Sequence, residues 1–194
     1  RRASRQPALR DWAGDPYDQD NPILVRQICQ KLLPQRGIVA SPDEILITGG
    51  TQNAFSMIAQ LLVAPGFTCA FEEPGHPDMR AVLRLHTANI QELAVDEEGL
   101  RVGDLAPGVS LLYCMPGLQY PTMVALSASR RAQLYRYARQ NGTIIVEDDV
   151  DAETLDGPDV PPSLKAQDPD GRVIYIGSFA KTLAPGMRIG FLVA

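Results

Sequence analysis

Short apolar runs recur along this chain, and segments with helical spacing separate several of them. The runs lie at residues 45–47, 68–72, 90–95, 110–115, 143–146, 173–176 and 189–193. Strands that alternate with helices build a parallel sheet with helices packed against it. The pattern therefore predicts an α/β fold around a mostly parallel seven-stranded sheet.

Four segments carry the helical spacing, and they begin near Pro22, Ala54, Met79 and Ser127. Proline suits the first turn of a helix and serine caps a helix N-terminus, so Pro22 and Ser127 mark two helix starts. The first helix, which we expect to run from about residue 23 to residue 33, ends at residues 34–37.

The first twenty residues differ from the rest because they are polar and irregular, with arginines followed by aspartates. We interpret residues 1–20 as a linker or N-terminal arm and residues 21–194 as one domain. The chain begins at Arg1 and ends within an apolar run, so we expect it to be a truncated part of a longer protein.

Composition limits the class of protein. Of the 194 residues, 45% are hydrophobic and 21% are charged, which is typical of a globular domain. The net charge of −5 argues against a nucleic-acid-binding surface on this chain. Three cysteines without Cys-x-x-Cys spacing favour a reducing, cytoplasmic setting. No apolar run approaches the roughly 18 residues of a membrane span, so no membrane partner is expected.

Residues 177–190 carry the most specific chemistry, because Ser178, Lys181 and Arg188 lie in a loop between two predicted strands. A lysine amine forms a Schiff base with an aldehyde, and a hydroxyl and a guanidinium bind phosphate. Pyridoxal phosphate (PLP) needs these groups. The alternatives are a surface loop with a solvated lysine, or the Ser-x-x-Lys of β-lactamase-like hydrolases. The second also needs Ser-Asp-Asn and Lys-Thr-Gly, which the chain lacks.

Two further segments with candidate chemistry follow predicted strands. Residues 48–52 form a strand-to-helix turn in which Gly49 and Gly50 allow a close backbone approach, and free N–H groups at the helix start bind phosphate. The alternative is a plain tight turn. His76 follows the next strand and its ring can stack on a flat cofactor, unless it is an ordinary loop histidine.

The other two segments carry an acid and an aromatic residue. An acid within residues 147–151 can pair with a protonated pyridine nitrogen. A divalent metal site and a solvated acidic loop are the alternatives, and the lack of a nearby histidine weighs against the metal. Tyr120 lies in the loop at residues 116–122, where it can reach a ring substituent or pack on the sheet.

Together these segments resemble the fold-type-I PLP enzymes, the aspartate aminotransferase superfamily. Within this group the chain is most similar to the aminotransferase-like domain of MocR-type transcriptional regulators of the GntR family. The matching segments are residues 48–54, 73–77, 119–122, 147–149 and 177–190, with residues 14–16 as a further match. The resemblance implies the large domain of the aspartate aminotransferase fold, which is a three-layer sandwich.

The resemblance also implies residue roles. Lys181 would be the catalytic residue that forms the Schiff base with PLP, and Asp148 would meet the pyridine nitrogen. His76 would stack on the ring, where the family usually has an aromatic residue, and Tyr120 would contact a ring substituent. The phosphate would be held by Gly50, Thr51, Gln52, Ser178 and Arg188.

Three positions depart from the family pattern. The family commonly carries tyrosine at the position of Val150, histidine at that of Leu118 and glycine at that of Met123. The loss of a phenol donor at position 150 would alter the tuning of the Schiff base. These departures affect transamination more than cofactor binding.

The resemblance implies a PLP-binding effector domain of a transcriptional regulator, which senses a small amine or amino acid. The intact protein would be a homodimer that binds DNA only through an N-terminal domain absent from this chain. A C-terminal small domain would also be absent, so catalysis by this chain alone is not expected. The alternatives are a fragment of a free-standing PLP-dependent aminotransferase and a degenerate domain that no longer holds PLP.

Overall fold

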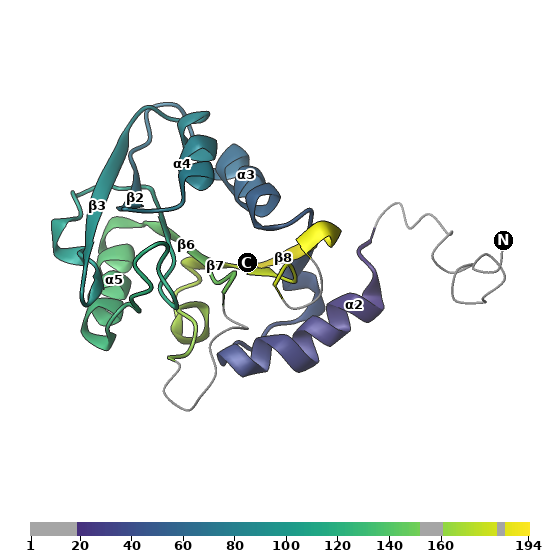
Figure 1. Ribbon diagram of the computed structural model, residues 1–194. Helices are drawn as coiled ribbons and strands as arrows, with labels where there is room; N and C mark the ends of the chain where they lie inside the picture. The colour runs from purple at the N-terminus through teal and green to yellow at the C-terminus, as the bar shows by residue number, and fades with distance from the viewer. Residues whose placement is uncertain (1–18, 152–160, 182–184) are drawn as a thin grey trace, which may run out of the picture.

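The computed structural model describes residues 19–151, 161–181 and 185–194, and their strands form one eight-stranded sheet (Figure 1). The spatial order of the strands is β1-β8-β7-β6-β5-β2-β3-β4. Their bounds are β1 Ile45–Thr48, β2 Cys69–Glu73, β3 Ile90–Asp96, β4 Gly99–Leu100, β5 Leu111–Cys114, β6 Ile144–Asp148, β7 Val173–Ser178 and β8 Gly190–Val193.

The centre of the sheet is parallel. Strands β3, β2, β5, β6 and β7 pair in parallel, whereas β8 runs antiparallel to both β7 and β1, and β4 runs antiparallel to β3. The carboxyl ends of the five parallel strands therefore lie at one edge of the sheet. The start of β8 joins this edge because its direction is reversed.

Helices cover both faces of the sheet. The α-helices are α2 Pro22–Gln27, α3 Thr51–Leu62, α4 Pro77–Arg84 and α5 Ala128–Asn141. Figure 1 shows α3 and α4 above the sheet and α5 and α2 below it. Short turns of other helix types are η2 Ile28–Leu32, η3 Leu33–Arg36, η4 Pro42–Glu44, η5 Val102–Asp104, η7 Lys165–Gln167 and η8 Pro185–Met187.

The strands bury both faces because alternate side chains point to opposite sides. On β5, Tyr113 packs into the core beneath α3 and α4, whereas Leu112 packs into the core beneath α5. On β6, Val146 packs into the core beneath α3 and α4, and Ile145 packs into the core beneath α5. A third apolar cluster joins α2 to β1, β7 and β8. The result is a three-layer sandwich.

The predicted α/β fold with a mostly parallel sheet is confirmed, and the sheet has eight strands rather than seven. The extra strand is β4, whose two residues pair with the end of β3. Two residues carry no periodic pattern from which a strand could be predicted. The helix expected at residues 23–33 is not one α-helix, since η2 and η3 continue α2 up to Arg36. Pro34 lies in η3, where its missing N–H and its ring limit continuation of an α-helix.

Candidate cofactor-binding site

The register of the strands brings two of the predicted segments, residues 48–52 and 177–190, to one edge of the sheet. Gly190, at the start of β8, pairs with Thr48 at the end of β1 and with Ser178 at the end of β7. The turn at residues 48–52, Ser178 and the residues just before β8 therefore converge there. Ligands in open α/β sheets bind beyond the carboxyl ends of the strands, which is this edge.

The turn between β1 and α3 presents backbone N–H groups. Gly50 caps the helix with φ +93°, a conformation that glycine adopts without steric cost. The first helical hydrogen bond runs from Ala54 N to Gly50 O at 3.1 Å, so the N–H groups of Thr51 and Gln52 precede the helical hydrogen bonds. Thr51 is half-buried and Gln52 is exposed. This helix start is suited to an anion.

Arg188 lies against this turn. A Cβ built on Gly50 would lie 3.3 Å from Nη2 of Arg188, so a larger residue at position 50 would meet the guanidinium. Arg188 itself has φ +50°, a left-handed conformation that non-glycine residues seldom adopt. The structure thus brings together two of the groups that were predicted to hold phosphate.

Ser178 lies at the end of β7, with its side chain largely buried. Its Oγ accepts a hydrogen bond from Ala180 N at 3.1 Å. A hydroxyl that accepts one bond keeps its own proton to donate. Ser178 can therefore donate to an anion at this edge.

Lys181 follows β7, and its amine pairs with the carboxylate of Asp151, which follows β6. The Lys181 side chain is 51% exposed. This pairing was not predicted from the sequence. The structure places Lys181 beyond the ends of β6 and β7, the same edge that carries Asp148 and Ser178.

The three consecutive acids of β6 and its end face different ways. Asp148 lies on the α3/α4 face of the sheet, where its Oδ2 accepts a hydrogen bond from Tyr113 Oη at 2.6 Å. Its Oδ1 accepts one from Val150 N at 3.1 Å. Burial raises the pKa of Asp148 to about 6, although the Tyr113 and Val150 hydrogen bonds favour the charged form.

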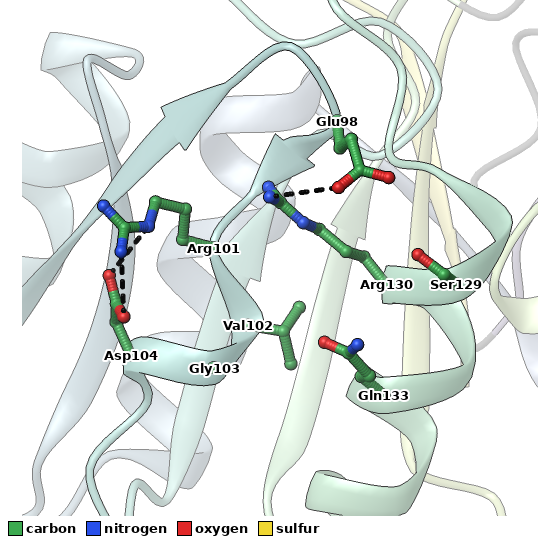
Figure 2. A pocket seen from close by; sticks show the side chains of 8 residues that line it. All are labelled: Glu98, Arg101, Val102, Gly103, Asp104, Ser129, Arg130 and Gln133. Atoms are coloured by element: carbon green, nitrogen blue, oxygen red, sulfur yellow. Dashed lines mark hydrogen bonds and ion pairs between the residues drawn. The ribbon is translucent and has the colours of Figure 1, made fainter.

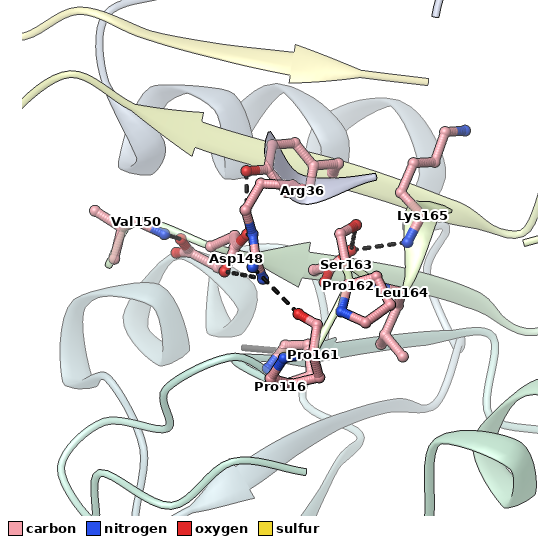
Figure 3. A network of polar contacts seen from close by, with 12 residues as sticks. Arg36, Pro116, Asp148, Val150, Pro161, Pro162, Ser163, Leu164 and Lys165 are labelled. Carbon is pink, nitrogen blue, oxygen red and sulfur yellow. Dashed lines mark hydrogen bonds and ion pairs between the residues drawn. The ribbon is translucent and has the colours of Figure 1, made fainter. Parts of the chain in front are cut away.

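Glu147 points to the opposite face, where it fixes a distant segment. It accepts hydrogen bonds from Ser163 Oγ at 2.7 Å, Leu164 N at 2.8 Å and Lys165 N at 2.9 Å. Burial raises the pKa of Glu147 to about 7. Figure 3 shows the segment from Pro161 to Lys165 against the strand.

Asp149 forms a buried ion pair with Arg36, with Nε and Oδ2 2.7 Å apart. Tyr175 Oη also donates to Asp149 Oδ2 at 3.1 Å. Arg36 reaches further to the carbonyl oxygen of Pro161 at 3.2 Å (Figure 3). Glu147 and Asp149 therefore hold the fold together, which leaves Asp148 as the acid available to a ligand on the α3/α4 face.

His76 and Tyr120 lie in two different loops, and their ring centroids are 5.4 Å apart. Gln119 joins these loops, since its Nε2 donates to Pro74 O at 2.7 Å while its Oε1 accepts from Thr122 Oγ1 at 2.7 Å. Among the described residues, the buried Nδ1 of His76 has no hydrogen-bond partner. The structure thus brings His76 and Tyr120 together, and His76 Nδ1 remains able to bind another partner.

The three departures from the family pattern have distinct surroundings. Val150 packs against the apolar core beneath α3 and α4, and Leu118 is half-buried. Met123 is 62% exposed and has φ +63°. A methionine therefore occupies a left-handed position at which glycine would be unstrained.

The arrangement fits PLP in its donor set. Residues Gly50, Thr51, Gln52, Ser178 and Arg188 form what we call the phosphate half of the site. Residues His76, Tyr120 and Asp148 form the ring half, and Lys181 lies at the same edge. An arginine and free N–H groups suit a phosphate, and a buried carboxylate suits a pyridinium.

The structure also contains a surface hollow of about 260 Å³ between η5 and the start of α5 (Figure 2). Its two arginines are already paired, Arg101 with Asp104 at 3.1 Å and Arg130 with Glu98 at 3.5 Å. This hollow carries none of the predicted site residues. Within residues 19–151, 161–181 and 185–194, no cluster of three or more histidine, cysteine or acidic residues is arranged to hold a metal ion.

None of the helices described is long and apolar enough to cross a membrane. Residues 14–16, which also took part in the resemblance, lie outside the described residues. The sequence predicted no individual role for Tyr113, for Gln119 within the matching segment 119–122, or for Asp151 within the acidic segment 147–151. Nothing in the pattern around Tyr113 distinguishes it from the other residues of an apolar run.

Comparison with known proteins places the chain among related sequences. Residues 17–194 match the family described as aminotransferase class I and II. TauR, an HTH-type transcriptional regulator of Rhodobacter capsulatus, is 41% identical over 182 residues, which are 94% of this chain and 38% of TauR. MocR of Rhizobium meliloti, a probable rhizopine catabolism regulatory protein, is 34% identical over 94% of this chain and 37% of MocR.

A solved aminotransferase structure is also similar to this chain. The kynurenine aminotransferase of Pyrococcus horikoshii, crystallised in complex with PMP, is 30% identical with a TM-score of 0.74. The match covers 88% of this chain and 43% of that enzyme. The chain therefore spans less than half the length of each of these relatives.

Proposed function

The chain belongs to the aminotransferase class I and II family, and we propose that it is the PLP-binding effector domain of a transcriptional regulator. The resemblance to MocR-type regulators is confirmed by the likeness to TauR and MocR. Residues 21–194 would form the PLP-binding large domain, and the protein would act in the cytoplasm. Its ligand would be a small amine or an amino acid.

One observation carries the cofactor proposal: the phosphate half and Asp148 lie at one edge of the sheet. Arg188 lies against the Gly50 turn. Ser178 is on β7, the strand next to β6, and it pairs with Gly190 on β8. Arg188, Ser178 and the N–H groups of Thr51 and Gln52 would hold the phosphate. When bound, PLP supplies an aldehyde that reacts with amines and a ring that withdraws electrons.

Each remaining residue has a task set by its surroundings. Asp148 would accept a hydrogen bond from the pyridine nitrogen, and its burial in a dry core strengthens that interaction. His76 and Tyr120 would contact the ring from two loops that Gln119 holds together. Lys181 would supply the amine that bonds to the cofactor, after leaving its partner Asp151.

A departure next to the ring half, Val150, supports the proposed sensing role. Val150 offers no phenol where the family commonly has one, which favours binding over efficient turnover. The regulators TauR and MocR also share more identity with the chain than the kynurenine aminotransferase does. DNA contact and dimer formation would depend on parts of the protein outside this chain. An enzyme fragment is the alternative that the structural likeness to the kynurenine aminotransferase favours.

The test uses the intact protein with added PLP. We expect a visible absorption band that Lys181→Ala abolishes and that Lys165→Ala, a control at another lysine, leaves in place. Failure of the unaltered protein to develop the band, or its persistence in Lys181→Ala, would remove the cofactor assignment.

A second measurement separates sensor from enzyme. Addition of single amino acids or amines to the PLP-loaded protein should change the visible spectrum and the affinity for DNA without forming a keto product. Steady release of a keto acid with no effect on DNA affinity would favour the enzyme fragment.

A further inference from the structure

Tyr113 carries a buried hydroxyl that the roles described so far do not use. Its Oη donates to Asp148 Oδ2 at 2.6 Å, and both side chains are almost completely buried. Tyr113 lies on β5 and Asp148 on the neighbouring strand β6, so the sheet itself fixes the distance between them. A phenol placed in this way acts on one carboxylate oxygen.

The ring of Tyr113 is held on two sides. It stacks on Phe71 with ring centroids 4.8 Å apart and planes 5° from parallel. Phe55 of α3 packs against it at 4.8 Å with planes 54° apart. Because the interior is close-packed, the phenol cannot swing away from Asp148 without displacing these rings.

Asp148 keeps capacity for a third partner. Tyr113 occupies one lone pair of Oδ2, and Val150 N occupies one of Oδ1. A carboxylate has about four lone-pair sites, so sites remain for a donor that approaches beyond the end of β6. The pyridine N–H of PLP is such a donor.

Burial disfavours the charged form of Asp148, which is the form that accepts a hydrogen bond from a pyridine N–H. It raises the pKa of Asp148 to about 6, so part of the protein carries the neutral acid in mildly acidic solution. Hydrogen bonds to the carboxylate favour its charged form, and the bond from Tyr113 is the largest such contribution.

Other titratable groups near this pair are few among the described residues. Asp149 follows Asp148 on the chain and raises the pKa of Asp148 further. Glu72 of β2 and Cys114 of β5 also interact with Asp148 or Tyr113, and burial raises the pKa of Glu72 to about 8. Near pH 7 Glu72 is therefore largely neutral. Tyr113 Oη and Val150 N are the two hydrogen-bond donors that counteract the effect of burial on the pKa of Asp148.

We propose that Tyr113 is a positioning residue, which keeps Asp148 charged and aimed at the pyridine nitrogen of a bound pyridoxal-type cofactor. The inference rests on the proposed function, since it assumes that such a cofactor binds here. Tyr113 makes no contact with the cofactor in this role and acts through Asp148 alone.

The experiment compares Tyr113→Phe with Tyr175→Phe in the intact protein. Tyr175 is a matched control because it is also a buried phenol that donates to an acid, Asp149, but on the other face of the sheet. The probe is pyridoxamine 5′-phosphate, which lacks the aldehyde, so its binding does not depend on a bond to Lys181. Its affinity is measured between pH 5 and pH 8, and titration of its phosphate is common to all variants.

We expect Tyr113→Phe to weaken binding about tenfold near pH 7, as loss of a hydrogen bond to a charged group does. The pH below which affinity falls should also rise by about one unit, because the neutral form of Asp148 persists to higher pH. Tyr175→Phe should change neither quantity. Equal affinities and equal pH profiles in the unaltered protein and both variants would overturn the inference while leaving the proposed function intact.

A cofactor-free measurement keeps the inference testable on its own. The free energy of unfolding of Tyr113→Phe should fall below that of the unaltered protein by more at pH 8 than at pH 5. The sign follows because the lost bond favours only the charged acid, whose population grows as pH rises through about 6. A difference that does not change with pH would contradict the inference, and a failure of the unaltered protein to bind the probe would instead refute the proposed function.

Discussion

The phosphate half of the site relies on a backbone turn as well as on side chains, whereas the ring half consists of side chains from three separate segments. Of these, Asp148 is buried, His76 is half-buried and Tyr120 is 46% exposed. In the phosphate half, Gly50 approaches Arg188 closely, and the neighbouring Gly190 leaves room for the Gly50 turn. In the ring half, Asp148 is buried and depends on Tyr113 and Val150 for its hydrogen bonds. The two halves meet at the same edge of the sheet.

This difference shows why the halves tolerate change differently. A backbone cradle fails when a side chain is added, since the glycines leave no room. A buried carboxylate fails when its partners are removed, since an uncompensated buried charge is costly. The three acids at the end of β6 are an example. They are adjacent in sequence, but only Asp148 lies on the α3/α4 face, whereas Glu147 and Asp149 bind other parts of the fold.

The largest effect is expected from Asp149→Ala, which tests whether orientation separates these acids. The change leaves Arg36 buried without its ion-pair partner, which costs about 3–5 kcal/mol of unfolding free energy. Denaturant unfolding measures this loss. The affinity of the folded variant for PLP should not fall, because the Asp149 carboxylate pairs with Arg36 and Tyr175 and its charge only raises the pKa of Asp148. A loss of affinity as large as that caused by Asp148→Asn would contradict the assignment.

A smaller effect is expected from Gly190→Ala, which tests the backbone cradle. A Cβ at position 190 would lie 3.0 Å from Gly50 Cα and 3.0 Å from Gly177 O. Overpacking of this kind costs about 1–3 kcal/mol, and it should displace the Gly50 turn and weaken PLP binding. Gly103→Ala is the control, since nothing lies within 4 Å of its built Cβ. Equal PLP affinities in the two variants would show that the cradle does not hold the phosphate.

The smallest effect is expected from Met123→Gly in the loop of the ring half. Met123 has φ +63° and is largely exposed, so glycine would relieve strain with little loss of packing. The greater chain entropy of glycine offsets part of the gain, which leaves a net stabilisation of about 0.5–1 kcal/mol. Val39→Gly, at an exposed residue without positive φ, should destabilise instead. Thermal unfolding of both variants decides whether the backbone is strained at position 123.

Much of the fold could be predicted because its strands are apolar runs. Each of the seven predicted runs overlaps one strand, namely β1, β2, β3, β5, β6, β7 or β8. Strand β4 could not be predicted, since it forms only by pairing with the end of β3. The division of the first helix into α2, η2 and η3 also gives no periodic signal in the sequence.

The two halves of the site also differ in how far the sequence could predict them. Its phosphate half follows from local motifs, because glycines and a serine near strand ends carry a known chemistry. The ring half depends on contacts between distant residues, such as Tyr113 with Asp148 and Gln119 with Pro74. Which of three adjacent acids faces the ligand depends on the pleat of β6 within the sheet, and the sequence suggested Asp148 only through resemblance.

The most direct test of the central claim is to locate the cofactor on the chain. The chain contains three lysines, Lys31, Lys165 and Lys181. The PLP-loaded intact protein is reduced with borohydride, which fixes the bond between cofactor and amine, and its peptides are analysed by mass spectrometry. We expect the phosphopyridoxyl group on Lys181 alone among these three lysines. Its presence on Lys31 or Lys165 in place of Lys181, or its absence from all three, would contradict the account.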